Sequence, residues 1–491
     1  MRIALALAVL VPGLCTAQEV HDHRPPETLG EVSFQITCGD AVQPEFNRGV
    51  ALLHSFAYAL AEQSFQKVTE RNPKCAMAHW GIAMTHFHQL WDPQIAPDVV
   101  SSAQSEIRQA KELGTDSERE RALINALSLV FEDVSTIPYR TRALNYEHAM
   151  SDIAAANKNV VEVQVFYALA LLANASPADQ AHAKQKQAVD LLDPLYRAYP
   201  KHPGIPHYII HACDNAELAS RGLPAARVYA KIAPSAPHAL HMPSHIFTRL
   251  GLWDDSIASN LAAKDSARQQ GDTGEELHAM DYLVYAYLQS GRDTDAAQVL
   301  QDLGNIKLHA VDFKTGYAST AMPVRYAVER GQWAEATNIV PPASAPPHVI
   351  AIALWARGMG LARNGRAAES QPEIDELRQI EARLRASGNE YWAAQVNIMM
   401  REVMAWSAQA DKKSTEATTL MRDAADAEDA IEKLPVTPGP IVPAREQLGE
   451  LLLEQSQPEL AAKEFETALL NAPGRRGALE GKARAARLSQ K

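Results

Sequence analysis

Histidines gather in one part of this sequence. Six of the seventeen histidines lie between residues 202 and 245. Imidazole is the commonest transition-metal ligand, and its ordinary pKa lies near neutral pH, so a group this dense indicates a metal-binding or proton-transfer site. The six are His202, His207, His211, His238, His241 and His245.

The first histidines of this group are predicted to share one face of a helix. Pro206 suits the first position of a helix, and His207, His211 and Asp214 follow at i, i+4 and i+7. At about 100° per residue, these three side chains project from the same side. Two imidazoles one turn apart bind a metal together with the carboxylate, or the carboxylate orients one imidazole from behind.

The remaining histidines are predicted beside a second helix. Pro243 is expected to begin it, with His241 just before the helix and His245 on its first turn. His238 lies in the preceding connector, where irregular backbone aims side chains inward. Farther along, His278 lies near the start of another predicted helix.

Both groups are expected to converge, because the helices that begin adjacent repeats of a stacked array have neighbouring ends. The predicted direct ligands are His207, His211, His241 and His245. Asp214 is predicted as a ligand or as an orienting carboxylate. The predicted acid-base or supporting neighbours are His202, His238 and His278. Weaker candidates on or beside the first helices of other repeats are His54, His79, His86 and His88.

A site of imidazoles and one carboxylate suits Zn, Cu, Fe or Ni, and the sequence does not choose among them. The chain has no HExxH, CxxCH, paired CxxC, glycine-rich phosphate loop or GxSxG motif. Phosphate-dependent and serine-hydrolase mechanisms therefore lack support. The alternative to a metal is a hydrogen-bond network across the repeat interface, because a single histidine on an apolar helix face is more often a packed residue.

The scaffold is predicted to be all-α. Apolar residues recur at i, i+3, i+4 and i+7 with many alanines, and period-2 alternation is nearly absent. Near the C-terminus, Gly449, Phe465 and Pro473 follow tetratricopeptide (TPR) spacing. The turns of the preceding hairpins are expected at Gly251, Gly291, Gly331 and Gly365. We therefore expect a right-handed α-solenoid of TPR-like helical hairpins. Recurring tyrosines on these helices, expected mainly as core, are Tyr208, Tyr282, Tyr285, Tyr317 and Tyr326.

The leader and the prolines suggest a division of the chain. An apolar run followed by Cys15-Thr16-Ala17 is typical of a signal peptide over residues 1–17, which predicts a periplasmic or secreted protein. A TPR-like solenoid is expected over 18–433, with the histidine-rich site at about 202–281. A proline-rich linker over 434–443 then precedes a C-terminal repeat over 444–491. No later segment is apolar enough to predict a transmembrane helix.

Charge and cysteines narrow the environment. The formal net charge is −12 without a basic run, so nucleic acid is not an expected partner. Cys38 and Cys75 flank the first predicted hairpin and are the expected disulfide pair. Cys213 is expected to be a small buried residue.

Three segments resemble a large family of exported bacterial TPR proteins without an established activity. They are HPGIPHYIIHACDNAE, LPAARVYAKIAPSAPHALHMPSHIFTRLGLWDDSIASN and LPVTPGPIVPAREQLGELLLE. The resemblance runs from about Phe46 to the C-terminus, and all seven predicted site residues from His202 to His245 match its pattern. It implies the fold and an exported location, and it supplies no reaction.

The leading hypothesis is an exported solenoid with a transition-metal site on its concave face, serving oxidative or hydrolytic chemistry. One alternative is a non-catalytic scaffold that binds a peptide or a partner protein in the concave groove. Another is metal storage or delivery.

Overall fold

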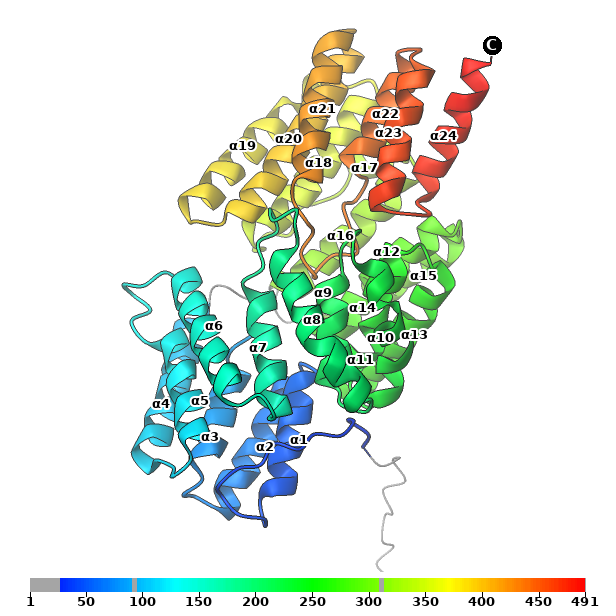
Figure 1. Ribbon diagram of the computed structural model, residues 1–491. Coiled ribbons are helices and arrows are strands. Elements are labelled where there is room, and N and C mark those ends of the chain that lie inside the picture. The colour runs from blue at the N-terminus through cyan, green and yellow to red at the C-terminus, as the bar shows by residue number, and fades with distance from the viewer. Residues whose placement is uncertain (1–26, 91–94, 309–312, 491) are drawn as a thin grey trace, which may run out of the picture.

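The chain folds into helices throughout the part that the structure describes. The computed structural model describes residues 27–90, 95–308 and 313–490, and these contain helices α1 to α24, one short 3₁₀ helix and no strand (Figure 1). This confirms the all-α prediction. The predicted signal peptide lies outside the described residues.

The helices follow one another as antiparallel hairpins. The first part contains α1 (Gln43–His54), α2 (Tyr58–Arg71), α3 (Ala76–Thr85), α4 (Pro97–Leu113), α5 (Glu118–Phe131), α6 (Tyr139–Ala156), α7 (Val161–Ala173) and α8 (Ala183–Ala198). The middle contains α9 (Gly204–Cys213), α10 (Ala219–Ile232), α11 (Pro237–His241), α12 (Pro243–Arg249), α13 (Trp253–Gln270), α14 (Thr273–Gln289), α15 (Asp293–Gly304) and α16 (Phe313–Glu329). The last part contains α17 (Trp333–Thr337), α18 (Pro347–Arg363), η1 (Ala367–Ser370), α19 (Gln371–Ala386), α20 (Glu390–Ala410), α21 (Ser414–Asp429), α22 (Ala444–Glu454), α23 (Pro458–Asn471) and α24 (Arg476–Ser489).

Glycine and phenylalanine interlock the terminal hairpins. A Cβ atom at Gly49 would lie 2.6 Å from the Phe65 ring, and one at Gly81 would lie 2.5 Å from it. At the other end of the chain, a Cβ atom at Gly449 would lie 2.7 Å from the Phe465 ring. Only glycine leaves room for these fully buried rings between antiparallel helices. The small-and-large spacing read from the sequence therefore corresponds to TPR-like packing.

The predicted hairpin turns form as expected. The four glycines at these turns have φ values between 62° and 74°, which is the left-handed region that ends a helix without strain only at glycine. They are Gly251, Gly291, Gly331 and Gly365.

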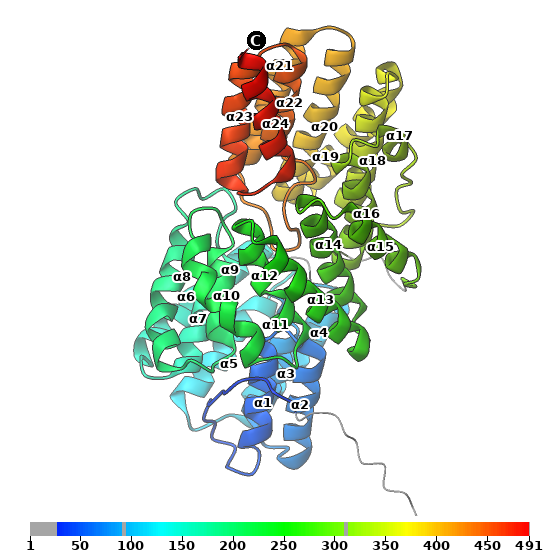
Figure 2. The same ribbon diagram turned by 90° about the vertical axis from the view of Figure 1, so that its right-hand side faces the viewer.

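Helices α14, α16, α18, α20 and α22 stack in order, and α24 returns to contact α14. Figures 1 and 2 show the resulting lower part, which holds α1 to α14, and an upper part made by α17 to α24. One apolar core runs from Leu29 to Phe247 and another from Tyr317 to Ala485. The histidine-rich helices lie close to the junction between these parts.

Residues 434–443, called here the proline strap, form no helix, as their prolines predict. Part of the strap is buried, including Val436 and Thr437. Arg325 on α16 donates to the carbonyl of Pro440 at 3.0 Å, and the Tyr282 hydroxyl on α14 donates to the carbonyl of Thr437 at 3.1 Å. The strap is therefore packed against the inner helices of the array (Figure 1).

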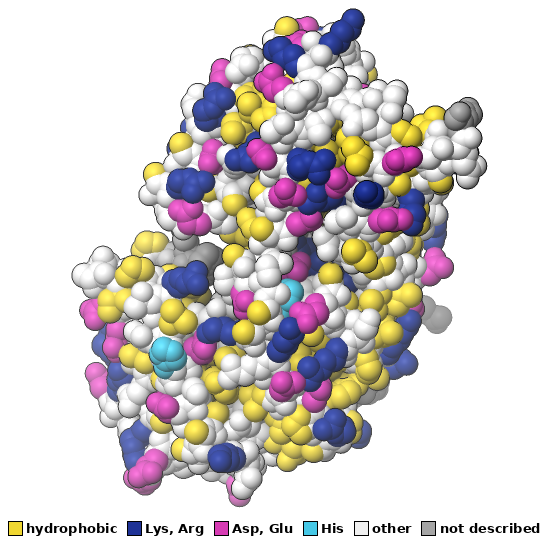
Figure 3. All heavy atoms as spheres, turned by 45° about the horizontal axis from the view of Figure 1, so that its top comes forward, with side chains coloured by type: hydrophobic (Ala, Val, Ile, Leu, Met, Phe, Trp, Pro, Cys, Tyr) yellow, Lys and Arg dark blue, Asp and Glu magenta, His cyan; other side chains and the backbone are white. Residues whose placement is uncertain are grey.

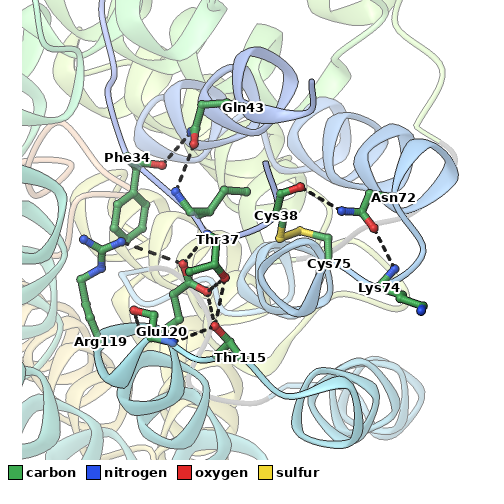
Figure 4. Close-up of a disulfide and its surroundings, with 12 residues drawn as sticks. Phe34, Thr37, Cys38, Gln43, Asn72, Lys74, Cys75, Thr115, Arg119 and Glu120 are labelled. Carbon is green, nitrogen blue, oxygen red and sulfur yellow. Dashed lines mark hydrogen bonds and ion pairs between the residues drawn. A yellow bond between two sulfur atoms is a disulfide. The ribbon is translucent and has the colours of Figure 1, made fainter. Parts of the chain in front are cut away.

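The expected disulfide forms between Cys38 and Cys75 (Figure 4). It joins the segment before α1 to the start of α3, with a Cα–Cα distance of 5.2 Å. Cys213 is free and buried, also as predicted, and burial raises its pKa to about 12. A structural disulfide is consistent with an oxidising compartment. Among the described helices, none has the length and apolar content needed to cross a membrane.

Replacing Cys38 by serine is expected to lower the free energy of unfolding by roughly 4 kcal/mol, because the disulfide restricts the unfolded chain across the 37-residue separation. Chemical denaturation measures this loss. Cys213→Ala, which removes the free thiol and keeps the disulfide, should cost much less. Equal losses in the two variants would contradict a stabilising role for the bridge.

Candidate metal centre

Four helices position the clustered histidines. His207 and His211 lie on α9, which begins at Gly204, two residues before the predicted start at Pro206. Pro243 begins α12, as predicted, and places His245 in its first turn. The local structure of the preceding segment differs from the prediction.

His238 and His241 do not lie in an irregular connector. They lie on α11, a single helical turn that Pro237 begins and that leads directly into α12. Proline fixes φ near the helical value, so each of two closely spaced prolines starts its own short helix. The side chains on this turn consequently have defined directions.

The first triad consists of His207, His211 and His238. The Nε2 atom of His207 lies 3.1 Å from Nε2 of His211 and 3.2 Å from Nε2 of His238. One ligand nitrogen from each residue lies within 4.8 Å of the others. Three imidazole nitrogens thus lie close enough together to hold one metal ion.

The second triad consists of His241, His245 and His278. Nε2 of His241 lies 3.0 Å from Nε2 of His245. The His278 ring, which comes from α14, lies 4.3 Å from the His241 ring between centroids. Here too, one ligand nitrogen from each residue lies within 4.8 Å of the others.

The two triads are neighbours. The rings of His211 and His245 lie 6.1 Å apart, as do those of His238 and His241. The imidazoles of both predicted groups therefore lie together, and they form two sets of three. His238 and His278, predicted as supporting groups, each complete a triad.

In four of these rings, Nδ1 points away from the triad and lies against a hydrogen-bond acceptor. Nδ1 of His207 donates to the carbonyl of His54 at 2.6 Å, and Nδ1 of His238 faces a Glu275 carboxylate oxygen at 3.2 Å. In the second triad, Nδ1 of His241 faces Asn260 Oδ1 at 2.6 Å, and Nδ1 of His245 faces Asp214 Oδ2 at 2.8 Å. Such partners fix the orientation of metal-binding imidazoles and leave Nε2 as the ligand atom.

These partners also fix where the protons are. The amide nitrogen of Asn260 donates to the Ser256 carbonyl, so its oxygen accepts from His241. Two cationic side chains keep Asp214 ionised, and an ionised carboxylate can only accept a hydrogen bond from His245. Both rings therefore carry a proton on Nδ1, and their Nε2 lone pairs face each other at 3.0 Å. Two lone pairs at this distance repel unless a cation lies between them.

Burial and neighbouring imidazoles keep four of these rings neutral at neutral pH. Burial, followed by the charges of His211 and His238, holds the pKa of His207 well below its ordinary value. The pKa values of His241 and His278 are also well below the ordinary value, mainly because of burial. Burial lowers the pKa of His245 to about 4. Neutral imidazole is the form that binds a metal.

Asp214 orients a ligand and is fully engaged in doing so. Its Oδ1 accepts from Arg249 at 2.9 Å, and its Oδ2 accepts from Lys433 at 2.6 Å and from His245. Burial by itself would raise the pKa of Asp214, but Lys433 and Arg249 hold the pKa well below its ordinary value. Of its two predicted roles, the geometry supports the orienting one.

A third buried group joins His54, Glu162 and His202. Nε2 of His54 lies 2.7 Å and Nε2 of His202 lies 2.9 Å from the two oxygens of Glu162. The remaining nitrogens are occupied as well, since Nδ1 of His54 contacts the Tyr208 hydroxyl and Nδ1 of His202 accepts from the Gly204 amide. This group is a satisfied hydrogen-bond network, and it supports the first triad through the His54 carbonyl.

Replacing Glu162 by glutamine is expected to destabilise the protein by about 1–3 kcal/mol, because a glutamine cannot accept from both buried imidazoles. Metal content should stay unchanged, because Glu162 belongs to the structural network. Urea denaturation and elemental analysis measure the two effects. A variant that loses an equivalent of metal would show that this third group is itself a metal site.

The other three weaker histidine candidates belong to neither triad. Nδ1 of His79 pairs with Glu106 at 2.7 Å, His86 contacts Ser102 at 3.1 Å, and the His88 ring stacks on Tyr58. Among the tyrosines, Tyr282 reaches the centre, with its hydroxyl 3.3 Å from Nδ1 of His245.

The sequence reading missed several residues of this centre. Glu275 precedes His278 by three residues and Asn260 lies in the DDSIASN segment, so proximity to the recognised motifs was the available signal for both. Lys433 directly precedes a recognised segment, but nothing in the sequence links it to Asp214, 219 residues away. Phe56 follows the weaker candidate His54 by two residues, and nothing in the sequence links it to the first triad.

The first triad faces open space, whereas the second is enclosed. A cleft of about 460 Å³ reaches His238 beside Phe56 and Tyr58, and a smaller one of about 140 Å³ reaches His211. In contrast, the residues of the second triad are at most 1% exposed. Isolated histidine side chains are visible on the face shown in Figure 3.

Phe56 covers the first triad in a strained conformation. Its φ of 53° is unfavourable for a bulky side chain, so the surrounding packing must hold it there. The Phe56 ring lies 4.5 Å from the His207 ring and 5.2 Å from the His238 ring between centroids. The residue thus separates the larger cleft from the converging nitrogens.

Comparisons with known proteins find distant structural similarity and no family. No protein-family model matches the chain, and no curated protein matches it. Among solved structures, the TPR domain of P58(IPK) is 12% identical over 92% of this chain and 99% of that one, with a TM-score of 0.21. Yeast Tom70 is 12% identical over 91% of this chain and 88% of that one, with a TM-score of 0.33. A chain of the APC/C hetero-tetramer Cut9-Hcn1 is 12% identical over 93% and 78%, respectively, with a TM-score of 0.36.

Proposed function

We propose that this protein is a copper protein in which the two triads bind a pair of copper ions for redox chemistry. The observation that carries the proposal is the convergence of three imidazoles in each triad, with outer nitrogens anchored by Asp214, Asn260, Glu275 and the His54 carbonyl. In the group around Glu162, by contrast, the partners of the imidazole nitrogens are a carboxylate, a hydroxyl and a backbone amide.

The ligand set favours copper among the metals that imidazole binds. Magnesium, calcium and manganese prefer oxygen ligands, and non-haem iron commonly adds a carboxylate to its histidines. The nearby carboxylates of Asp214 and Glu275 are already bound to imidazole Nδ1 atoms and to lysine or arginine side chains. An all-imidazole pair remains, and copper has the highest affinity in the divalent series.

The two triads differ in their surroundings, and we infer that they have different roles. His241, His245 and His278 hold their position away from water, because each is almost fully buried. The first triad lies beside the two clefts, and Phe56 lies between the larger cleft and the ligand nitrogens. A small molecule in that cleft would reach the triad past the Phe56 ring. With one copper ion bound at each triad, the pair would supply electron exchange with a small oxidant such as dioxygen.

We also infer that the protein is exported and belongs to the bacterial TPR family that its motifs resemble. The disulfide supports an oxidising location. A peptide-binding scaffold receives less support, although helical repeats commonly bind peptides. The proline strap of this same chain already occupies part of the space between the inner helices.

Copper titration of the metal-free protein tests the proposal. We expect about two tightly bound equivalents of Cu per chain, measured by elemental analysis after gel filtration, and a rise in the unfolding temperature. A parallel zinc titration distinguishes general imidazole affinity from copper preference. Retention of less than about a tenth of an equivalent of either metal would overturn the proposed function.

A further inference from the structure

Another cavity lies beside the proline strap. This cavity of about 370 Å³ is bounded by α18, α20, α21 and the strap. Its aromatic walls are formed by Tyr285, Tyr317, Trp355, Tyr391 and Trp392. Its size falls within the range of small-molecule sites, and an aromatic lining with a few polar groups is typical of them.

Two carboxyl groups in this lining have no ion-pair partner among the described residues. Glu402 on α20 is 3% exposed, and one of its oxygens accepts from the Gln447 amide at 2.6 Å. Glu428 on α21 accepts from the backbone N–H of Ala444 at 2.8 Å. Both donors are neutral. The charges of Arg475 and Arg445 act on Glu428 without an ion pair in the described structure, so no cation directly contacts either carboxyl group.

The basic side chains in the lining are engaged elsewhere. Arg249 and Lys433 bind Asp214. Arg445 binds Asp429, and it also pairs with Glu464. The protein therefore supplies cations to its other carboxylates, but it leaves those of Glu402 and Glu428 facing an aromatic cavity.

We propose that this cavity binds a small organic cation, an ammonium ion on an aromatic or apolar body. The ammonium group pairs with the carboxylates of Glu402 and Glu428, and the rings of Trp355 and Tyr391 attract its positive charge. The apolar body of the ligand packs against the remaining aromatic side chains and Ile441 of the strap. Metal at the two triads is not required for this binding.

The pKa values of both acids are raised, as expected for buried carboxyl groups without a cationic partner. Burial, followed by the charge of Glu428, raises the pKa of Glu402 well above its ordinary value. Burial raises the pKa of Glu428 to about 8. A bound ammonium group would replace the proton that otherwise neutralises the pair.

Isothermal titration of the metal-free, full-length protein with 2-phenylethylamine tests the site. 2-Phenylethanol, which has the same ring without the positive charge, is expected to bind at least about tenfold more weakly. Glu402→Gln and Glu428→Gln should each weaken amine binding by about tenfold or more. Because these carboxyls are already inclined to hold a proton, glutamine preserves their shape and hydrogen bonding, and circular dichroism verifies the fold.

Glu450→Gln is the matched control. Glu450 on α22 is also a substantially buried acid whose pKa is raised by burial, but it lies outside the cavity and contacts Arg484. This variant should bind the amine as the wild type does. The proposal is overturned if the alcohol binds as tightly as the amine, if both cavity variants retain wild-type affinity, or if no amine binding is detected up to about 10 mM.

Discussion

Replacing His207 and His238 together by alanine is expected to reduce bound copper from about two equivalents per chain to about one. The pair supplies two of the three ligands of the first triad, whereas the second triad keeps all three of its own. Replacing His241 and His245 should remove the other equivalent. Elemental analysis after copper loading measures both losses, with circular dichroism to verify the helical fold.

The matched control replaces two histidines that belong to neither triad. His148 is exposed, and the His86 side chain contacts the Ser102 hydroxyl. The His86→Ala, His148→Ala variant should retain about two equivalents of copper. If either triad variant also retained both equivalents, the triads would not be the binding sites.

Replacing Asp214 by asparagine is expected to cost about 3–5 kcal/mol of stability in the metal-free protein. The change leaves the buried cations of Lys433 and Arg249 without their shared carboxylate. It also leaves one acceptor oxygen where the carboxylate had two, so Nδ1 of His245 competes with Lys433 and Arg249 for it. Copper affinity at the second triad should therefore fall by about 10–100-fold. Urea denaturation and competition with a copper chelator measure the two effects.

The stabilisation from Asp214 has a definite dependence on pH. Its pKa in the folded protein lies well below the unfolded value, because Lys433 and Arg249 outweigh the effect of burial. The contribution is therefore present above the unfolded pKa and is lost as the pH falls through the folded one. Asp190→Asn is the control, because its exposed ion pair with Arg221 should contribute less than about 1 kcal/mol. Equal losses for the two variants would contradict the role given to Asp214.

The scaffold could be predicted because its signals are local. Helical periodicity, turn glycines such as Gly251 and the glycine-phenylalanine spacing around Phe465 each act over a few residues or one hairpin. The disulfide could also be predicted, because Cys38 and Cys75 flank a single hairpin. Each of these features constrains the fold independently of distant parts of the chain.

The site was predictable only where its geometry is local. His207 and His211 lie one turn apart on one helix, and their shared face follows from the helical period. The division into two triads depends on how α11 and α14 are rotated against α9, which is set by packing. For this reason, His238 and His278 were assigned supporting roles from the sequence, although their rings lie among the other imidazoles.

Contacts between residues far apart in the chain were harder still to predict from the sequence. Lys433 reaches Asp214 across 219 residues because the strap returns to the histidine-rich helices, and no pattern near either residue predicts that return. Phe56 similarly reaches the first triad from the end of α1. Such contacts follow from the superhelical path of the whole array.

Anomalous X-ray diffraction at the copper edge from copper-loaded crystals tests the paired centre most directly. We predict two anomalous peaks, one among Nε2 of His207 and the other first-triad ligands, and one among the ligands of the second triad, with copper–nitrogen distances of about 2.0 Å. Peaks confined to surface sites, or to the group around Glu162, would contradict the paired copper centre.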